Sequence, residues 1–166
     1  MYLPGTEGNK KIVETFGEAV FNPEDGTINR KVLGALVFGE DNKHNMKRLT
    51  DIVWPGIYSL AQQEISRLRS EGVAKVVLVE AAVLVEAGWG DLVDELWVLY
   101  VEEEVACERL MKRNSLSKEE CLKRIQSQLS NEARLAAATI KIDAGGAEET
   151  VREKVSAEYL RLLERV

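Results

Sequence analysis

The spacing of apolar residues predicts that the first seventy residues are helical. Apolar side chains recur every three or four positions in three stretches, residues 12–20, 32–37 and 46–68. Pro23, Asp25 and Gly26 predict a tight turn between the first two helices, and Asn29 is a suitable N-cap for the second. Pro55 lies inside the third stretch and is expected to kink that helix or divide it in two.

The second half of the chain has a different pattern. Residues 76–79 form an apolar run without alternation, which is typical of a strand buried on both faces. Two further strands are expected at residues 94–101 and 139–143, and helical segments separate them. This order predicts an α/β fold with a parallel sheet, in which ligands bind beyond the carboxyl ends of the strands. Glu80 and Asp143 end two of these strands and are site candidates, although surface acids that cap the next element occur at such positions too.

Composition narrows the class of protein. The chain has 166 residues, of which 45% are hydrophobic, enough for one core with a satellite subdomain. Its net charge of −6 argues against a dedicated nucleic-acid binder. Glu80 interrupts the longest apolar run, so no membrane span is expected. These properties predict a soluble, acidic, intracellular protein.

Few residues are candidates for nucleophilic or metal chemistry. His44 is the only histidine and lies in a polar stretch, so it is expected at the surface and cannot build a multi-histidine site. Cys107 and Cys121 form no Cys-x-x-Cys pair and have no neighbouring histidine. Both cysteines are therefore expected to be buried packing residues in a reducing compartment.

A basic helical stretch is the stronger candidate for a binding site. Arg109 and Arg113 are four residues apart and share one helical face. Two guanidinium groups at this spacing suit a polyphosphate, and Arg124 and Arg134 follow in the next helices and can converge on the same anion. The alternative is a solvated basic face paired with the acidic residues at 102–104 and 108.

Several short motifs occur in a fixed order that spans nearly the whole chain. They are residues 16–17, 25–34, 37–38, 78–89, 109–113, 116–120, 128–135 and 142–143. Together they resemble the dephospho-CoA kinase family of P-loop kinases. The details at residues 29–34 and 86–89 are most similar to the kinase domain of eukaryotic bifunctional coenzyme A synthase.

The resemblance implies ATP-dependent transfer of a phosphoryl group to the ribose 3′-hydroxyl of dephospho-CoA, with Mg²⁺. It implies a P-loop-kinase-like, three-layer α/β fold with a parallel sheet. The fold would be a single domain over residues 1–166, in which residues 6–70 are a helical CoA-binding part and residues 102–138 are a lid. No nucleic acid or membrane partner is implied. The expected location is the cytoplasm, with mitochondrial association as an alternative.

The resemblance also implies roles for individual residues. Arg109, Arg113 and Arg134 would bind ATP phosphates, and Asp143 and Gly145 would belong to a loop near the adenine base. The substrate would contact Arg30 and Glu86. Glu80 would be a Walker-B-like acid at a position where the family usually has aspartate, a change that keeps the charge and adds a methylene group.

One family motif does not occur in the sequence. No Gly-x-x-x-x-Gly-Lys-Ser/Thr segment is present, whereas the family begins with this phosphate-binding loop. The resemblance therefore implies that the first βαβ unit and the general base are missing, and that the chain is truncated and inactive alone. Strands 76–79 and 96–101 would lose their shared neighbour. We expect them to pair directly or to accept a strand from a second copy or a partner chain; the alternative is that the sequence is a fragment of a longer protein.

Three functions stay open at this point. The first is a dephospho-CoA kinase represented by an incomplete chain. The second is a non-catalytic, degenerate kinase module that binds CoA-like ligands or a partner protein. The third is a fragment of another nucleoside or nucleotide kinase, which fits the lid arginines but not the stretch at residues 25–34.

Overall fold

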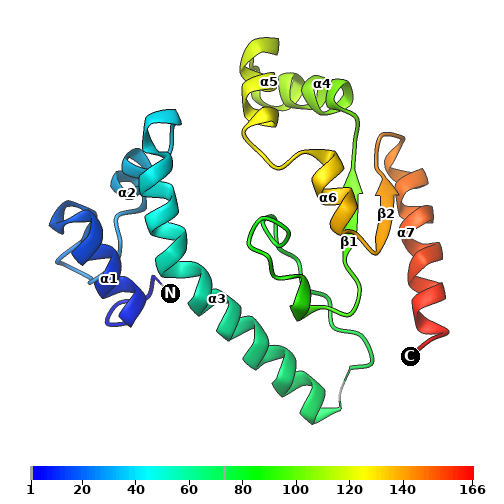
Figure 1. Cartoon of the computed structure of the whole chain (residues 1–166), viewed down its shortest axis with the longest axis horizontal. Coiled ribbons are helices and arrows are strands. Elements are labelled where there is room, and N and C mark those ends of the chain that lie inside the picture. Colours follow the sequence, from blue (N-terminus) through cyan, green and yellow to red (C-terminus); the bar gives the residue numbers. More distant parts are fainter. Residues whose placement is uncertain (1, 73) are drawn as a thin grey trace. The chain divides into compact units, whose positions relative to one another are not determined.

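A computed structural model describes residues 2–72 and 74–166 of the chain. The chain divides into two compact units, unit 1 (Met1–Ala74) and unit 2 (Lys75–Val166), each with its own secondary structure (Figure 1). Within the described residues, no helix combines the length and the apolar character needed to cross a membrane.

Unit 1 is helical, as its sequence predicts. Its helices are α1 (Glu7–Phe16), α2 (Arg30–Val37) and α3 (Lys43–Glu71), with short 3-10 turns at Glu18–Val20 and Glu40–Asn42. The predicted cap of α2 is confirmed, because the Asn29 side chain accepts a hydrogen bond from the Val32 N–H at 3.2 Å. Gly72 ends α3 with a positive φ of 62°, a conformation that favours glycine.

A small hairpin connects α1 to α2. Phe21 and Ile28 form an antiparallel bridge, and Gly26 has a φ of 73° in the predicted turn. Asn9 of α1 is only 4% exposed, and its Nδ2 donates a hydrogen bond to the Gly26 carbonyl at 3.1 Å. This buried amide holds the hairpin against α1.

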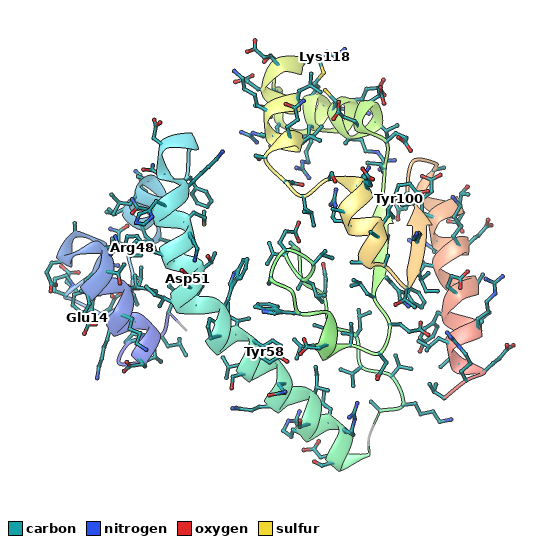
Figure 2. The ribbon with its side chains drawn as sticks, in the orientation of Figure 1. Glu14, Arg48, Asp51, Tyr58, Tyr100 and Lys118 are labelled. Carbon is teal, nitrogen blue, oxygen red and sulfur yellow. The ribbon has the colours of Figure 1, made fainter. Side chains whose placement is uncertain are left out.

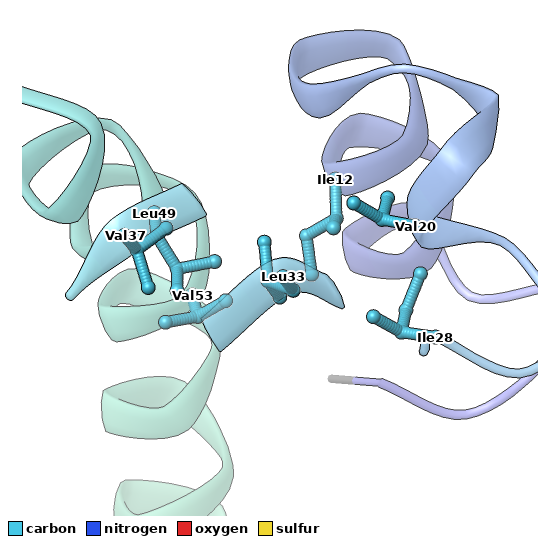
Figure 3. Packing of buried hydrophobic residues seen from close by; sticks show 7 residues of the cluster. All are labelled: Ile12, Val20, Ile28, Leu33, Val37, Leu49 and Val53. Carbon is cyan, nitrogen blue, oxygen red and sulfur yellow. The ribbon is translucent and has the colours of Figure 1, made fainter. Parts of the chain in front are cut away.

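Seven buried apolar side chains form the core of unit 1 (Figure 3). They are Ile12, Val20, Ile28, Leu33, Val37, Leu49 and Val53. Three helices and the hairpin all contribute, so the core ties these elements together. The predicted apolar faces at residues 12–20 and 32–37 therefore contribute to the core, whereas the predicted face at residues 46–68 is buried only at Leu49 and Val53, and Ile57 and Leu60 are exposed. His44 is exposed, as expected.

α3 runs through Pro55 without interruption, so the predicted division of this helix is wrong. Proline removes one backbone donor, the one that would bond to the Asp51 carbonyl. The loss of one hydrogen bond does not end a helix of 29 residues that is anchored in the core on one side of the proline. Both buried residues of α3, Leu49 and Val53, precede Pro55.

Unit 2 contains a small parallel sheet with helices, which confirms the predicted α/β class. β1 (Trp97–Tyr100) pairs in parallel with β2 (Ile140–Asp143), in a register that places Trp97 beside Ile140. The segment between the strands forms α4 (Glu103–Asn114), α5 (Lys118–Gln126) and α6 (Asn131–Ala137). After β2 comes α7 (Glu148–Leu163), and a 3-10 turn at Gly90–Leu92 precedes β1.

The predicted strand at residues 76–79 is not found. These residues have no regular structure, Leu78 is 88% exposed and Val77 is 38% exposed. The expected direct pairing of this segment with β1 is therefore wrong as well. A strand requires a hydrogen-bonded neighbour, and an apolar run in the sequence does not show that such a neighbour is present. Glu80 consequently does not end a strand. Pairing with a second copy or a partner chain stays a prediction.

Hydrogen-bonded turns at residues 82–88 replace the helical segment expected between the first two predicted strands. Leu84 and Trp89 are the buried residues of this segment, and the Trp89 N–H donates to the Leu84 carbonyl at 3.0 Å. The segment is thus folded locally although it is not a regular helix.

The pair α4 and α5 is built around the two cysteines. Cys107 is 4% exposed and Cys121 has no exposed surface, which confirms their prediction as packing residues. Burial raises the pKa of the Cys121 thiol, and the neighbouring Cys107 raises it further. Ser117 and Glu120 form the reciprocal capping box that begins α5.

Candidate functional site

The carboxyl ends of β1 and β2 meet at one edge of the sheet. The Ala144 N–H, directly after β2, donates to the carbonyl of Tyr100, the last residue of β1, at 2.8 Å. Figure 2 labels Tyr100 at this end of β1. Because ligands of parallel α/β sheets bind beyond this edge, the side chains that reach it are the candidates for function.

Arg109 of α4 reaches the loop that leaves β2. Its Nη2 donates to three successive carbonyls, those of Ala144 at 2.9 Å, Gly145 at 3.3 Å and Gly146 at 3.4 Å. The shortest of these contacts connects α4 to the turn that follows β2. The predicted lid residue Arg109 and the predicted loop residue Gly145 are therefore in direct contact.

The same loop is also held from two other sides. The Asp143 Oδ1 accepts a hydrogen bond from the Gly145 N–H at 2.8 Å. A Cβ atom on Gly145 would lie 3.0 Å from that oxygen, so glycine permits the close approach. Lys154 of α7 donates to the Asp143 carbonyl at 3.0 Å, and its Nζ lies 3.7 Å from the Asp143 carboxylate. Sequence reasoning missed Lys154, because nothing near it in the chain distinguishes it from other exposed lysines.

Arg134 of α6 is tied to the end of β1 through one intermediate side chain. Its Nη2 donates to the Asn131 Oδ1 at 2.9 Å, and the Asn131 Nδ2 donates to the Val101 carbonyl at 2.7 Å. The Nε of Arg134 is buried and has no hydrogen-bond partner among the described residues. Two guanidinium groups, those of Arg109 and Arg134, are thus connected to backbone carbonyls that follow the two strands.

Arg113 is not connected to this edge. It is exposed on α4, and its Nε donates to the Asn114 side chain at 2.9 Å. Within the described part of unit 2, neither Arg109 nor Arg113 forms an ion pair with the acidic residues at 102–104 or 108. The pairing that the solvated-face alternative requires is therefore not observed.

Among the predicted substrate residues, Arg30 belongs to unit 1. It is exposed at the start of α2, and its guanidinium carbon lies 5.5 Å from the centre of the Tyr2 ring. Burial raises the pKa of Tyr2, and the positive charge of Arg30 offsets part of that rise. A second arginine in unit 1, Arg48, lies over the Phe16 ring and is labelled in Figure 2.

The two predicted acidic site residues, Glu80 and Glu86, lie in unit 2. Glu80 is exposed in irregular structure, and Glu86 is exposed in the turns at residues 82–88. The described residues contain no group of three or more histidine, cysteine or acidic side chains that could hold a metal ion.

Comparisons with known proteins identify the family of the chain. A sequence model described as dephospho-CoA kinase matches residues 1–149. The dephospho-CoA kinase of Geobacter sulfurreducens is 39% identical over 153 residues, which cover 92% of this chain and 76% of that protein. The chain belongs to the dephospho-CoA kinase family. Another member, from Carboxydothermus hydrogenoformans, is 38% identical over 152 residues, covering 92% of this chain and 72% of that protein.

Solved structures support the same membership in the dephospho-CoA kinase family. The dephospho-CoA kinase of Campylobacter jejuni has a TM-score of 0.67 and 26% identity, and the match covers 94% of this chain and 76% of that one. A Thermus thermophilus crystal structure has a TM-score of 0.68 and 28% identity, with coverages of 93% and 76%. The family sequence match ends at residue 149, so Lys154 lies beyond it.

Proposed function

We propose that this chain takes part in the ATP-dependent phosphorylation of the ribose 3′-hydroxyl of dephospho-CoA. One observation carries the proposal: a chain of this family holds two guanidinium groups at the carboxyl edge of its parallel sheet. Phosphoryl transfer depends on the positioning of phosphates and on the stabilisation of their charge, and fixed arginines supply both.

The proposed nucleotide site lies in unit 2. Arg134, whose Nε has no hydrogen-bond partner among the described residues, and the exposed Arg113 are the proposed contacts for the phosphates. Arg109 acts on the loop around Asp143 and Gly145, which we propose as the adenine side of the site. Only the Nη2 of Arg109 donates to this loop, so we propose that the other nitrogens of its guanidinium group face the phosphates.

Unit 1, over residues 6–70, is proposed as the part that binds dephospho-CoA. Arg30 is the proposed contact for the negatively charged substrate there, with Glu86 of unit 2 as a further substrate residue. Residues 102–138 are the proposed lid. The likeness of residues 29–34 and 86–89 to the eukaryotic bifunctional enzyme is part of this proposal and rests on those residues alone.

Mg²⁺ is expected to arrive with ATP. In kinases this ion binds substrate phosphates, waters and one or two carboxylates, and it neutralises phosphate charge. The described residues do not gather a full ligand set, and Glu80 is the one carboxylate that we propose for it.

We further propose that these 166 residues do not catalyse the reaction by themselves. The sequence contains no Gly-x-x-x-x-Gly-Lys-Ser/Thr loop, and the three arginines cannot replace its backbone amides, lysine and hydroxyl. A cytoplasmic location, mitochondrial association and a second copy or partner chain stay predictions.

The test compares two polypeptides. One is the 166-residue chain, and the other is the same chain preceded by a βαβ segment that carries a Gly-x-x-x-x-Gly-Lys-Ser/Thr loop. We expect dephospho-CoA to bind both in calorimetry and ATP-dependent phosphorylation only with the second. Turnover near 1 s⁻¹ by the chain alone would overturn the proposed inactivity. Binding to both without turnover by either would favour a non-catalytic module, and no binding to either would overturn the proposed function.

A further inference from the structure

Asn131 connects a strand end to an arginine. It is the half-buried first residue of α6, and both ends of its amide are used. Its Nδ2 donates to the Val101 carbonyl at 2.7 Å, and its Oδ1 accepts from the Arg134 Nη2 at 2.9 Å. Capping of α6 does not need Asn131, because the Ser130 Oγ already accepts from the Ala133 N–H at 3.2 Å. The Asn131 side chain therefore binds Arg134 and does not cap the helix.

The edge of the Arg134 guanidinium group that is formed by Nε and Nη2 has one hydrogen-bond acceptor among the described residues, whereas the same edge of Arg67 has two. In Arg67, Nε and Nη2 together hold the Glu64 carboxylate, at 2.9 Å and 2.6 Å. In Arg134 the Nη2 has Asn131 as its acceptor, but the buried Nε has none among the described residues. A buried charged donor without a partner requires an explanation, and this edge of a guanidinium group suits an oxyanion.

The residue type at position 131 fits an anion site. A neutral amide orients Arg134 and leaves its positive charge available, whereas a carboxylate at the same place would neutralise that charge. We propose that Asn131 is a positioning residue that holds Arg134 at the carboxyl end of β1, so that the guanidinium group is available to an oxyanion of the phosphate class. This inference deepens the proposed function and rests on it for the identity of the phosphate as part of a nucleotide.

The experiment follows the side-chain Nε–Hε resonance of Arg134 by NMR in the full chain, with Arg134→Lys used to assign it. Inorganic tripolyphosphate and ATP are titrated separately. We expect a saturable shift of this resonance with both. Tighter binding of ATP indicates a nucleotide site, and equal binding indicates a general polyphosphate site; either agrees with the proposed positioning. The absence of any shift would overturn it.

Two substitutions separate positioning from a merely structural role. Asn131→Ala removes both bonds, and we expect about tenfold weaker tripolyphosphate binding, which equals about 1.4 kcal/mol. Asn131→Asp keeps an acceptor for Arg134 but adds a negative charge, so it should weaken binding more than Asn131→Ala while the thermal unfolding of the chain changes less. Equal affinities in the wild type and both variants would overturn the inference.

A matched control comes from unit 1. Asn45 is also half-buried, and its Nδ2 donates to the Leu36 carbonyl at 3.0 Å, but it bonds to no arginine. Asn45→Ala should leave tripolyphosphate affinity unchanged. Calorimetric binding of dephospho-CoA to the Asn131 variants tests the proposed function separately. If dephospho-CoA fails to bind while the Arg134 resonance still shifts, the proposed function fails and the positioning role of Asn131 stands.

Discussion

Arg109→Ala should loosen the loop after β2 without unfolding the sheet. The substitution removes the only side chain among the described residues that donates to the carbonyls of Ala144, Gly145 and Gly146. The contact at 2.9 Å has good geometry, and the two at 3.3 Å and 3.4 Å are long and share the same nitrogen. One charge-assisted bond at an exposed site therefore sets the magnitude, about 1.5 kcal/mol.

Amide hydrogen exchange measures this loosening directly. The Gly145 N–H donates to the Asp143 side chain, so its exchange reports opening of the loop. A loss of about 1.4 kcal/mol corresponds to about tenfold faster exchange. The Thr139 N–H, which donates to the Leu96 carbonyl at the other end of the strands, should keep its rate.

Arg113→Ala is the matched control for Arg109→Ala. It removes an exposed arginine from the same helix that does not contact the loop. We expect no change in Gly145 exchange in this variant. The reasoning is refuted if Gly145 exchanges equally fast in the wild type and in Arg109→Ala, or if Arg113→Ala accelerates it to the same extent.

Three further predictions concern stability and reactivity. Ile12→Ala should lower the free energy of unfolding by about 2–5 kcal/mol in urea titrations, because the side chain is fully buried. Leu60→Ala, at a site 55% exposed, should change it by less than about 0.5 kcal/mol. Similar losses in the two variants would contradict the proposed core. Ser117→Ala should cost about 1 kcal/mol at neutral pH. Hydrogen bonds from Ser117 lower the pKa of Glu120, so the contact between the Ser117 hydroxyl and this carboxylate stabilises the fold above the ordinary glutamate pKa and is lost as pH falls through the lowered value. The difference in unfolding free energy between the variant and the wild type should therefore shrink in acid to the part supplied by the N-cap bond from the Glu120 N–H, which does not titrate. A difference that stays constant with pH would count against this. Because its pKa is raised and it is buried, Cys121 should resist alkylation in the native chain and react only after unfolding, as mass spectrometry would show; rapid native labelling would contradict its burial.

Local signals in the sequence were sufficient for most helices. Asn29 and Ser117 mark helix starts because the side chain that caps a helix lies within three residues of the amide that it satisfies. The strand at residues 76–79 was mispredicted for the opposite reason. A strand depends on a neighbour elsewhere in the chain, and the hydrophobicity of Leu78 did not indicate whether that neighbour is present.

The candidate site shows the same limit. The sequence pointed to Arg109 and Arg134 by residue type and spacing, but not to their contacts. Arg109 bonds to carbonyls 35 to 37 residues away, and Asn131 bonds to a carbonyl 30 residues away. Such contacts follow from the tertiary fold, so Asn131 could not be distinguished from an ordinary polar residue at a helix start.

Pro55 separates two parts of α3 that should melt differently. The part before it is anchored by Leu49 and Val53, whereas the 16 residues from 56 to 71 contain no buried side chain and are near the length at which an isolated helix is marginal. Ion pairs of Arg67 with its helical neighbours contribute only about 0.2–0.5 kcal/mol each. On heating, far-UV ellipticity should decline gradually before the cooperative transition. The fluorescence of Trp54, which packs against the core, should change only at that transition in a variant where it is the sole tryptophan. An enthalpy fitted to ellipticity alone would then understate the cooperativity of the fold.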